Sequence, residues 1–142
     1  MGPVDYLIVG FPGNKFSGKI APELANLERK GIIRVIDLLF VLKDANGRML
    51  VTEAKDLEGE AGRAFAAITK NTKEWFHQGD IDALAKVLPN NSSAAFLLYE
   101  NVWAIAFKEA LLAADAELID MGRIPQAAIE QAEEELIEKG EL

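Results

Sequence analysis

The segment from Gly13 to Lys19 has the spacing closest to a known chemical motif. It reads Gly-Asn-Lys-Phe-Ser-Gly-Lys and satisfies G-x-x-x-x-G-K, in which backbone N–H groups and a lysine bind phosphate oxygens. That motif needs Ser or Thr at the next position to bind Mg²⁺, and this chain has Ile20 there. We therefore interpret the segment as a connecting loop, and keep simple anion binding as a second interpretation. The anion-binding candidates are Asn14, Lys15, Ser17, Gly18 and Lys19.

Asp37 is the second residue that could do chemistry, because it stands in the middle of the apolar segment Ile32–Lys43. A carboxylate in such a place is costly unless it is paired or exposed. In a functional interpretation it is an acid, a base or a ligand anchor in a cleft. We favour a structural interpretation, in which Asp37 pairs with a basic residue such as Arg48 or with a backbone donor. The polar groups expected to project from strands as ligand-binding candidates are Asp37, Tyr6, Tyr99 and Arg48.

No further set of residues forms a catalytic or metal-ligating pattern. The chain has one histidine, His77, and no cysteine, which excludes a disulfide framework, thiol chemistry and iron–sulfur clusters. One histidine cannot build a His-rich metal site, and no nucleophile motif accompanies it. The sequence therefore predicts no metal and no other cofactor, and an enzymatic activity is the less favoured interpretation.

The charge balance restricts the partners. The chain contains 15 Lys+Arg against 23 Asp+Glu, which gives a formal net charge of −8. Nucleic acids and anionic membrane surfaces attract basic proteins, so neither is expected as a partner. The longest apolar runs, Leu38–Leu42 and Ala94–Tyr99, are far shorter than the roughly 18 residues of a membrane helix. Residues 1–9 read as the start of a strand rather than a secretory signal, so we expect a cytoplasmic protein.

The elements that position these residues follow from the periodicity of apolar side chains. Strands are expected at Val4–Val9, Ile32–Lys43, Arg48–Ala54 and Ser93–Glu100, with a short peripheral strand at Ala116–Asp120. Helices are expected at Ser17–Lys30, Ala61–Trp75, Ile81–Leu88, Val102–Ala114 and Pro125–Lys139. The Asn46-Gly47 pair predicts a hairpin turn between the two middle strands, because both residues tolerate positive φ.

This order predicts one α+β domain over residues 1–142. Two hairpin strands flanked by helical crossovers form the split β-α-β arrangement of ferredoxin-like domains, here with an added strand and extra helices. The extra helices form an insertion at about residues 56–88. Both side-chain parities of Ile33–Leu42 are apolar, so both faces of the sheet need cover. Either the extra helices or another subunit covers the second face, and we expect a homo-oligomer.

Three segments carry a resemblance to a known family. They are Gly2–Asn14 (GPVDYLIVGFPGN), Ile33–Gly47 (IRVIDLLFVLKDANG) and Ser92–Glu100 (SSAAFLLYE). Over nearly the whole chain they resemble a bacterial family of about this length that is known only as a domain of unknown function. A more distant resemblance is to an uncharacterised family with a glycine-rich, apolar, membrane-associated stretch between its halves. Here the polar segment Asp56–Gly79 takes that place, so the resemblance implies the fold but no membrane association, catalytic residue or cofactor.

The last 18 residues, Pro125–Leu142, contain six glutamates and one lysine. This acidic helix is either a solvated helix docked by a narrow apolar stripe, or a detachable helix that contacts a basic partner or a neighbouring subunit. Our leading functional hypothesis is a non-enzymatic, homo-oligomeric assembly or regulatory module. The alternative is a small-molecule-binding or cofactor-independent catalytic domain, with its cleft on the sheet or between subunits.

Overall fold

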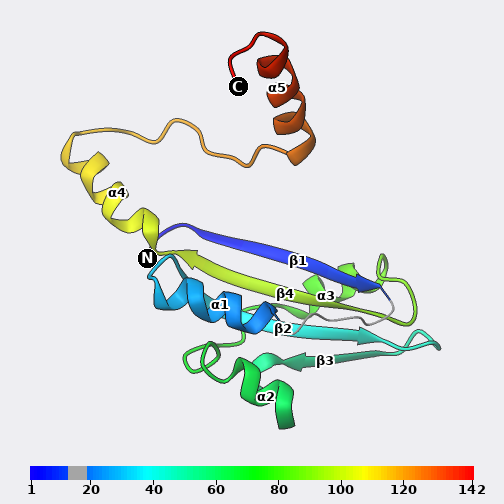
Figure 1. Cartoon of the computed structure of the whole chain (residues 1–142). Helices are drawn as coiled ribbons and strands as arrows, with labels where there is room; N and C mark the ends of the chain where they lie inside the picture. The colour runs from blue at the N-terminus through cyan, green and yellow to red at the C-terminus, as the bar shows by residue number, and fades with distance from the viewer. Residues whose placement is uncertain (13–18) are drawn as a thin grey trace. The chain divides into compact units, whose positions relative to one another are not determined.

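The computed structural model describes residues 1–12 and 19–142 and shows a mixed α+β fold (Figure 1). It divides into two units, residues 1–110 and residues 111–142. The strands are β1 (Val4–Pro12), β2 (Ile33–Lys43), β3 (Met49–Glu53) and β4 (Ser92–Asn101). The helices are α1 (Ile20–Arg29), α2 (Gly59–Phe65), α3 (Gln78–Ala85), α4 (Trp103–Ala113) and α5 (Gln126–Glu138), and a short 3-10 helix covers Ala54–Asp56.

The described strands form one antiparallel sheet in the order β1-β4-β2-β3. Because β1 and β2 each pair antiparallel with β4, they run parallel to each other, and α1 connects them. This is a split β-α-β unit, as the sequence predicts, but the order alone does not confirm a ferredoxin-like topology. The hairpin between β2 and β3 is confirmed: Asp44 Oδ1 accepts hydrogen bonds from the N–H groups of Asn46 and Arg48, both at 2.9 Å, and Gly47 has a φ of 83°.

A bulge in β2 changes which of its residues face each side of the sheet. The register against β4 shifts between Val35 and Asp37, so Ile36 is the extra residue and is itself buried. Side chains alternate between the faces on either side of the bulge. Val35 before it and Leu38 after it therefore share one face, whereas Asp37 and Leu39 lie on the other.

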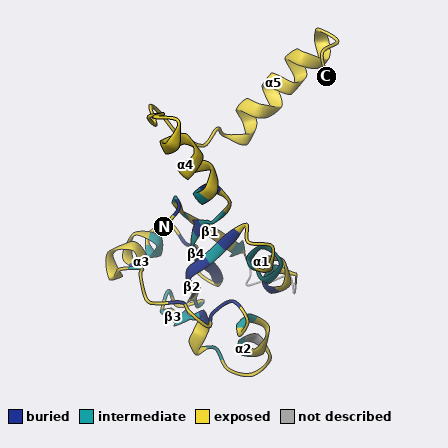
Figure 2. Cartoon of the chain, turned by 90° about the vertical axis from the view of Figure 1, so that its left-hand side faces the viewer, coloured by how far each residue is buried: buried dark blue, intermediate teal, exposed yellow. Residues whose placement is uncertain are grey.

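Each face of the sheet has its own core, so helices cover both faces in part. Figure 2 shows buried residues concentrated in the sheet, with α1 and α2 on one side and α3 on the other. The core on the side of α1 and α2 consists of Ile33, Val35, Leu38, Ala54, Ile68 and Leu97. The core on the α3 side consists of Leu39, Val41, Ile81, Leu88, Ala94 and Phe96.

The predicted helix Ala61–Trp75 is wrong in its second half, because α2 ends at Phe65. Thr69 Oγ1 donates to the Phe65 carbonyl at 2.9 Å and Thr72 Oγ1 donates to the Thr69 carbonyl at 3.0 Å. Such side-chain bonds compete with the helical ladder. The chain then extends along the sheet, where the N–H of Lys73 donates to the carbonyl of Ile36 at 3.1 Å. Helix α1 starts at Ile20, and Ser17, at which the predicted helix begins, lies outside the described residues.

The second unit contains the end of α4, a connecting segment and α5. The predicted strand Ala116–Asp120 is wrong: in this described segment no regular secondary structure forms. An isolated five-residue strand has no partner for its backbone, and Ile119 is 96% exposed. The predicted C-terminal helix is confirmed as α5, none of whose residues is buried. Every helix in the described part of the chain is too short or too polar to cross a lipid bilayer.

Candidate functional site

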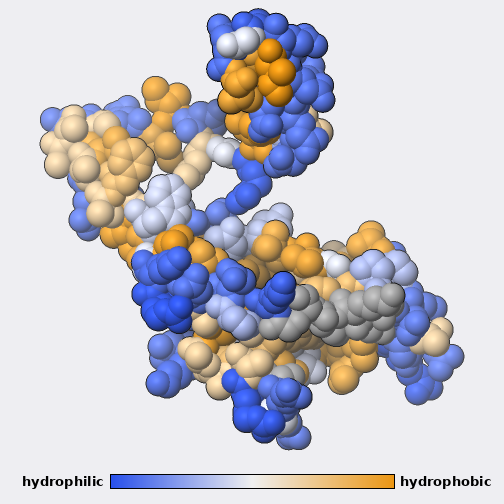
Figure 3. Space-filling view, viewed as in Figure 1, coloured by the Kyte–Doolittle hydropathy of each residue, from blue (hydrophilic) through white to orange (hydrophobic). Residues whose placement is uncertain are grey.

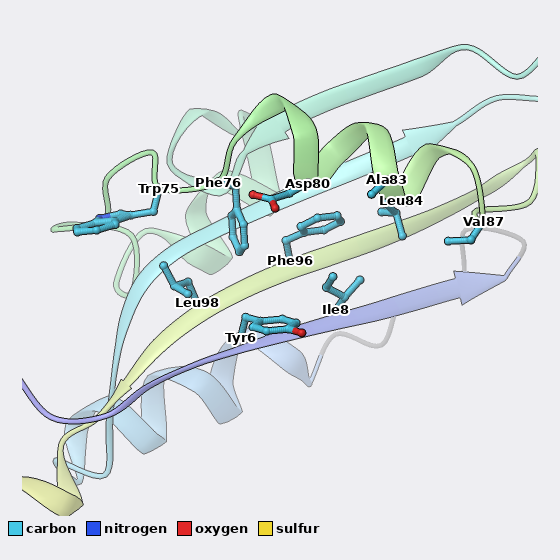
Figure 4. A pocket seen from close by; sticks show the side chains of 10 residues that line it. All are labelled: Tyr6, Ile8, Trp75, Phe76, Asp80, Ala83, Leu84, Val87, Phe96 and Leu98. Carbon is cyan, nitrogen blue, oxygen red and sulfur yellow. The ribbon is translucent and has the colours of Figure 1, made fainter. Parts of the chain in front are cut away.

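A groove of about 520 Å³ lies on the α3 side of the sheet, between β1 and α3 (Figure 4). Four lining residues come from the sheet. Tyr6 and Ile8 are two residues apart on β1, so their side chains point to the same face. They pair with Leu98 and Phe96 of β4, whose side chains therefore lie on that face too. The other wall comes from the segment before α3 and from α3 with the turn after it. This wall consists of Trp75, Phe76, Asp80, Ala83, Leu84 and Val87.

An aromatic pair joins the floor of the groove to its wall. Phe96 is fully buried, and its ring meets that of Phe76 edge to face, with ring centroids 5.3 Å apart and an interplanar angle of 89°. The rim is open, since Tyr6 is 71% and Trp75 is 54% exposed. The groove thus combines a preformed apolar floor with large aromatic side chains that solvent can reach.

Asp37 is buried behind the wall of the groove and fixes that wall in place. Its side chain is fully buried, and Oδ2 accepts hydrogen bonds from the N–H groups of Trp75 at 2.9 Å and Phe76 at 3.4 Å. These bonds agree with the structural interpretation, in which backbone N–H groups are the partners of Asp37. Arg48 is not the partner in this structure, because it is exposed next to the hairpin turn and bonds through its backbone to Asp44.

Glu53, at the end of β3, is the second carboxyl group of this buried cluster. Within the described residues, Asp37 Oδ1 and Glu53 Oε2 are both buried and receive no N–H or O–H donor from a third side chain. Burial, together with a hydrogen bond to Asp37 and repulsion by its carboxylate, raises the pKa of Glu53 to about 8. Glu53 therefore keeps its proton at neutral pH and donates it to Asp37, so that one proton joins the two carboxyl groups.

A second buried carboxylate fastens the start of the chain. Glu100 Oε2 accepts a hydrogen bond from the N–H of Gly2 at 2.5 Å, and Oε1 accepts one from Arg34 Nε at 2.8 Å. The Gly2 hydrogen bond and the Arg34 guanidinium lower the pKa of Glu100, although its burial opposes them. Glu100 does not line the groove, and we assign it a structural role at the base of β1.

The structure does not gather the four ligand-binding candidates into one cavity. Tyr6 lines the groove, and Asp37 lies behind its wall. Tyr99 faces the opposite side of the sheet, where it packs against the core beneath α1 and α2. Arg48 lies at the hairpin, away from the lining residues.

Only one of the anion-binding candidates can be placed. Lys19 is exposed and immediately precedes α1. The other four lie outside the described residues: Asn14, Lys15, Ser17 and Gly18. In the described part of the chain, no three His, Asp or Glu side chains are grouped closely enough to hold a metal ion.

The comparison with known families explains the sequence resemblance. Residues 1–139 match the family model DUF6325, which describes a family of unknown function. The chain belongs to this family. No curated protein and no solved structure matches the chain. DUF6325 membership therefore confirms the predicted resemblance to a family of unknown function and assigns no activity, so the function of this member must be inferred from its own surfaces.

Proposed function

We propose that this DUF6325 member is a non-enzymatic module that assembles with copies of itself through strand β1. The observation that carries the proposal is the exposure of this strand. β1 is nine residues long and, among the described strands, pairs only with β4. Figure 3 shows apolar surface along the edge of the sheet where β1 lies in Figure 1. The exposed large apolar residues of β1 are Val4, Tyr6, Leu7, Ile8 and Val9.

The composition of β1 supports self-pairing. Proteins that stay monomeric protect their sheet edges with lysines, prolines, bulges or very short strands. The sequence of β1 contains one charged residue, Asp5, and one proline, Pro12, which is its last residue. The opposite edge strand, β3, has five residues. β1 is therefore the edge better suited to accept another strand.

Antiparallel pairing of β1 with its copy would join two sheets across a twofold axis. In such an interface the same surface of both protomers is used, and the unpaired backbone groups of the two edges satisfy each other. Leu7 lies on the α1 side of the sheet and Ile8 on the α3 side, so apolar surface on both faces would become buried. This burial adds a hydrophobic contribution to the backbone hydrogen bonds.

The acidic helix α5 is the second interaction surface of the proposal. Its apolar residues Ile129, Leu136 and Ile137 are exposed. Figure 3 shows an apolar patch surrounded by hydrophilic surface on the unit that contains α5. A helix of 13 residues is marginally stable alone in water, so we infer that it docks on a basic partner or a neighbouring subunit. The proposal includes two further parts. The fold is related to ferredoxin-like domains, which the split β1-α1-β2 unit supports. The protein is located in the cytoplasm.

Sedimentation velocity of the wild type and two variants tests the assembly. Leu7→Lys places a charge on β1 outside the groove, and Leu50→Lys makes the same change on β3, where the leucine is similarly exposed (48% and 61%). We expect the wild type and Leu50→Lys to sediment as dimers, and Leu7→Lys to sediment as a monomer with an unchanged circular dichroism spectrum. A monomeric wild type at tens of micromolar, or a dimeric Leu7→Lys variant, would refute the proposal.

A further inference from the structure

We propose that the groove between β1 and α3 binds a small organic cation with an apolar body, of the alkylammonium or arylammonium class. The inference goes beyond assembly through β1. Assembly uses the backbone edge of β1, whereas the groove uses the side chains that Tyr6 and Ile8 present on one face of the sheet. Its volume of about 520 Å³ fits a molecule of metabolite size.

Charge complementarity selects the class of ligand. Among the described residues that line the groove, Asp80 is the only one with a formally charged side chain, and none of them is Lys, Arg or His. Asp80 Oδ2 accepts a hydrogen bond from the N–H of His77 at 2.9 Å, which holds the carboxylate at the start of α3. Figure 4 shows this carboxylate beside the Phe76 ring. An ionised carboxylate accepts several hydrogen bonds at once, so Asp80 retains acceptor sites for a ligand N–H.

The aromatic residues of the lining also favour a cationic ligand. Ring faces carry negative charge density and attract ammonium groups, so Tyr6, Trp75 and Phe76 favour a cation over an anion. The apolar body of the ligand would pack on the floor formed by Phe96 and by the aliphatic lining residues. The wall needs no large rearrangement to receive it, because Asp37 already holds the backbone of Trp75 and Phe76.

Three soluble probes of nearly equal shape test the inference: phenethylammonium, the neutral phenethyl alcohol and the anionic phenylacetate. The chain has two tryptophans, so a Trp103→Phe background leaves Trp75 as the only tryptophan, which can be excited selectively over the tyrosines. We expect phenethylammonium to quench Trp75 and to bind at least roughly fivefold more tightly than the alcohol, with phenylacetate weakest. Calorimetry on the unmodified protein provides the same three affinities without a reporter mutation.

Asp80→Asn is the decisive variant, because asparagine keeps an oxygen acceptor for the N–H of His77 and removes the charge. Asp82→Asn is the matched control: it removes one charge from the same helix, and Asp82 bonds to Gln78 rather than lining the groove. We expect Asp80→Asn to remove most of the preference for the cation, leaving only the part that the aromatic rings supply, and Asp82→Asn to keep it in full. Equal affinity for ammonium and alcohol in the wild type, equal losses in both variants, or no binding of any probe would overturn the inference.

Discussion

Replacing Glu53 by glutamine should remove a pH dependence of stability that the wild-type protein carries. The pKa of Glu53 is about 8 in the folded protein, against an ordinary value of 4.5. Between these values the folded state holds a proton that the unfolded state has lost, so the free energy of unfolding falls as the pH rises. Below about 4.5 and above about 8 the two states bind the same number of protons at this site, and the effect levels off.

The size of the effect follows from the same linkage. Each pH unit inside this window lowers the free energy of unfolding by at most about 1.4 kcal/mol. Glu53 is only half-buried, so solvent screening reduces the total, and we expect a loss of about 1–2 kcal/mol across the window. In Glu53→Gln the amide still donates a hydrogen bond to Asp37 but cannot ionise. The variant should therefore be more stable than the wild type near pH 8 by a similar amount.

Urea denaturation at a series of pH values measures this difference. The wild type contains other titrating groups, so the quantity of interest is the wild-type curve minus the Glu53→Gln curve, which isolates one residue. Glu58→Gln is the matched control, since it makes the same substitution at an exposed position, and its curve should run parallel to the wild type. A constant offset between wild type and Glu53→Gln at all pH values, or a wild type that gains relative stability as the pH rises, would contradict the shared proton.

Three further substitutions test the packing and the second buried carboxylate by chemical denaturation. Gly2→Ala should destabilise the protein by about 1–3 kcal/mol, because an added Cβ would lie 2.6 Å from the carbonyl oxygen of Asn101; unchanged stability would contradict this close packing. Phe96→Ala should cost about 3–5 kcal/mol, since the ring is fully buried, and a loss below 1 kcal/mol would show that the core refills. Glu100→Gln should flatten the acid limb of the stability profile: the lowered pKa stabilises the wild type above about 4.5, and this advantage disappears as the pH falls. An equally steep acid limb in this variant would exclude Glu100, with its hydrogen bonds from Gly2 and Arg34, as the cause.

The local elements could be predicted because their signals are local. Alternation and turn chemistry define the four strands and the Asn46-Gly47 hairpin, and apolar periodicity defines the last helix. The two apolar parities of β2 predict that both faces of the sheet need cover, and each face has its own core. The bulge at Ile36 could not be predicted from the sequence, because it depends on how β2 pairs with the distant strand β4.

The candidate site could be predicted only in part, because its contacts are long-range. Asp37 stood out as a charged residue in an apolar strand, and Tyr6 as a polar group on a strand. Glu53 gave no comparable signal: its proximity to Asp37 depends on the pairing of β3 with β2, which sets it opposite Leu39. Trp75 carried a misleading signal, since its spacing fits a helix.

The carboxyl pair and the groove are connected through one short segment. Asp37 uses one oxygen for the shared proton with Glu53 and the other for the backbone of Trp75 and Phe76, which form a wall of the groove. Ionisation of Glu53 would set two negative charges side by side behind that wall, and repulsion would then act on the same carboxylate that holds it. Rising pH should therefore loosen the wall at the same time as it lowers stability.

Strand β1 links the groove to the proposed assembly in a similar way. Tyr6 and Ile8 line the groove with their side chains, while the backbone of the same residues belongs to the edge that we expect to pair. Linkage requires reciprocity: if a bound cation changes the dimerisation constant by some factor, dimerisation changes the affinity for the cation by the same factor. Two independent titrations, one of protein at fixed ligand and one of ligand at fixed protein, must then return one coupling constant. If both titrations give the same coupling factor and it differs from one, cation binding and dimerisation through β1 are coupled. If the factor is one, the edge of β1 and the groove act independently.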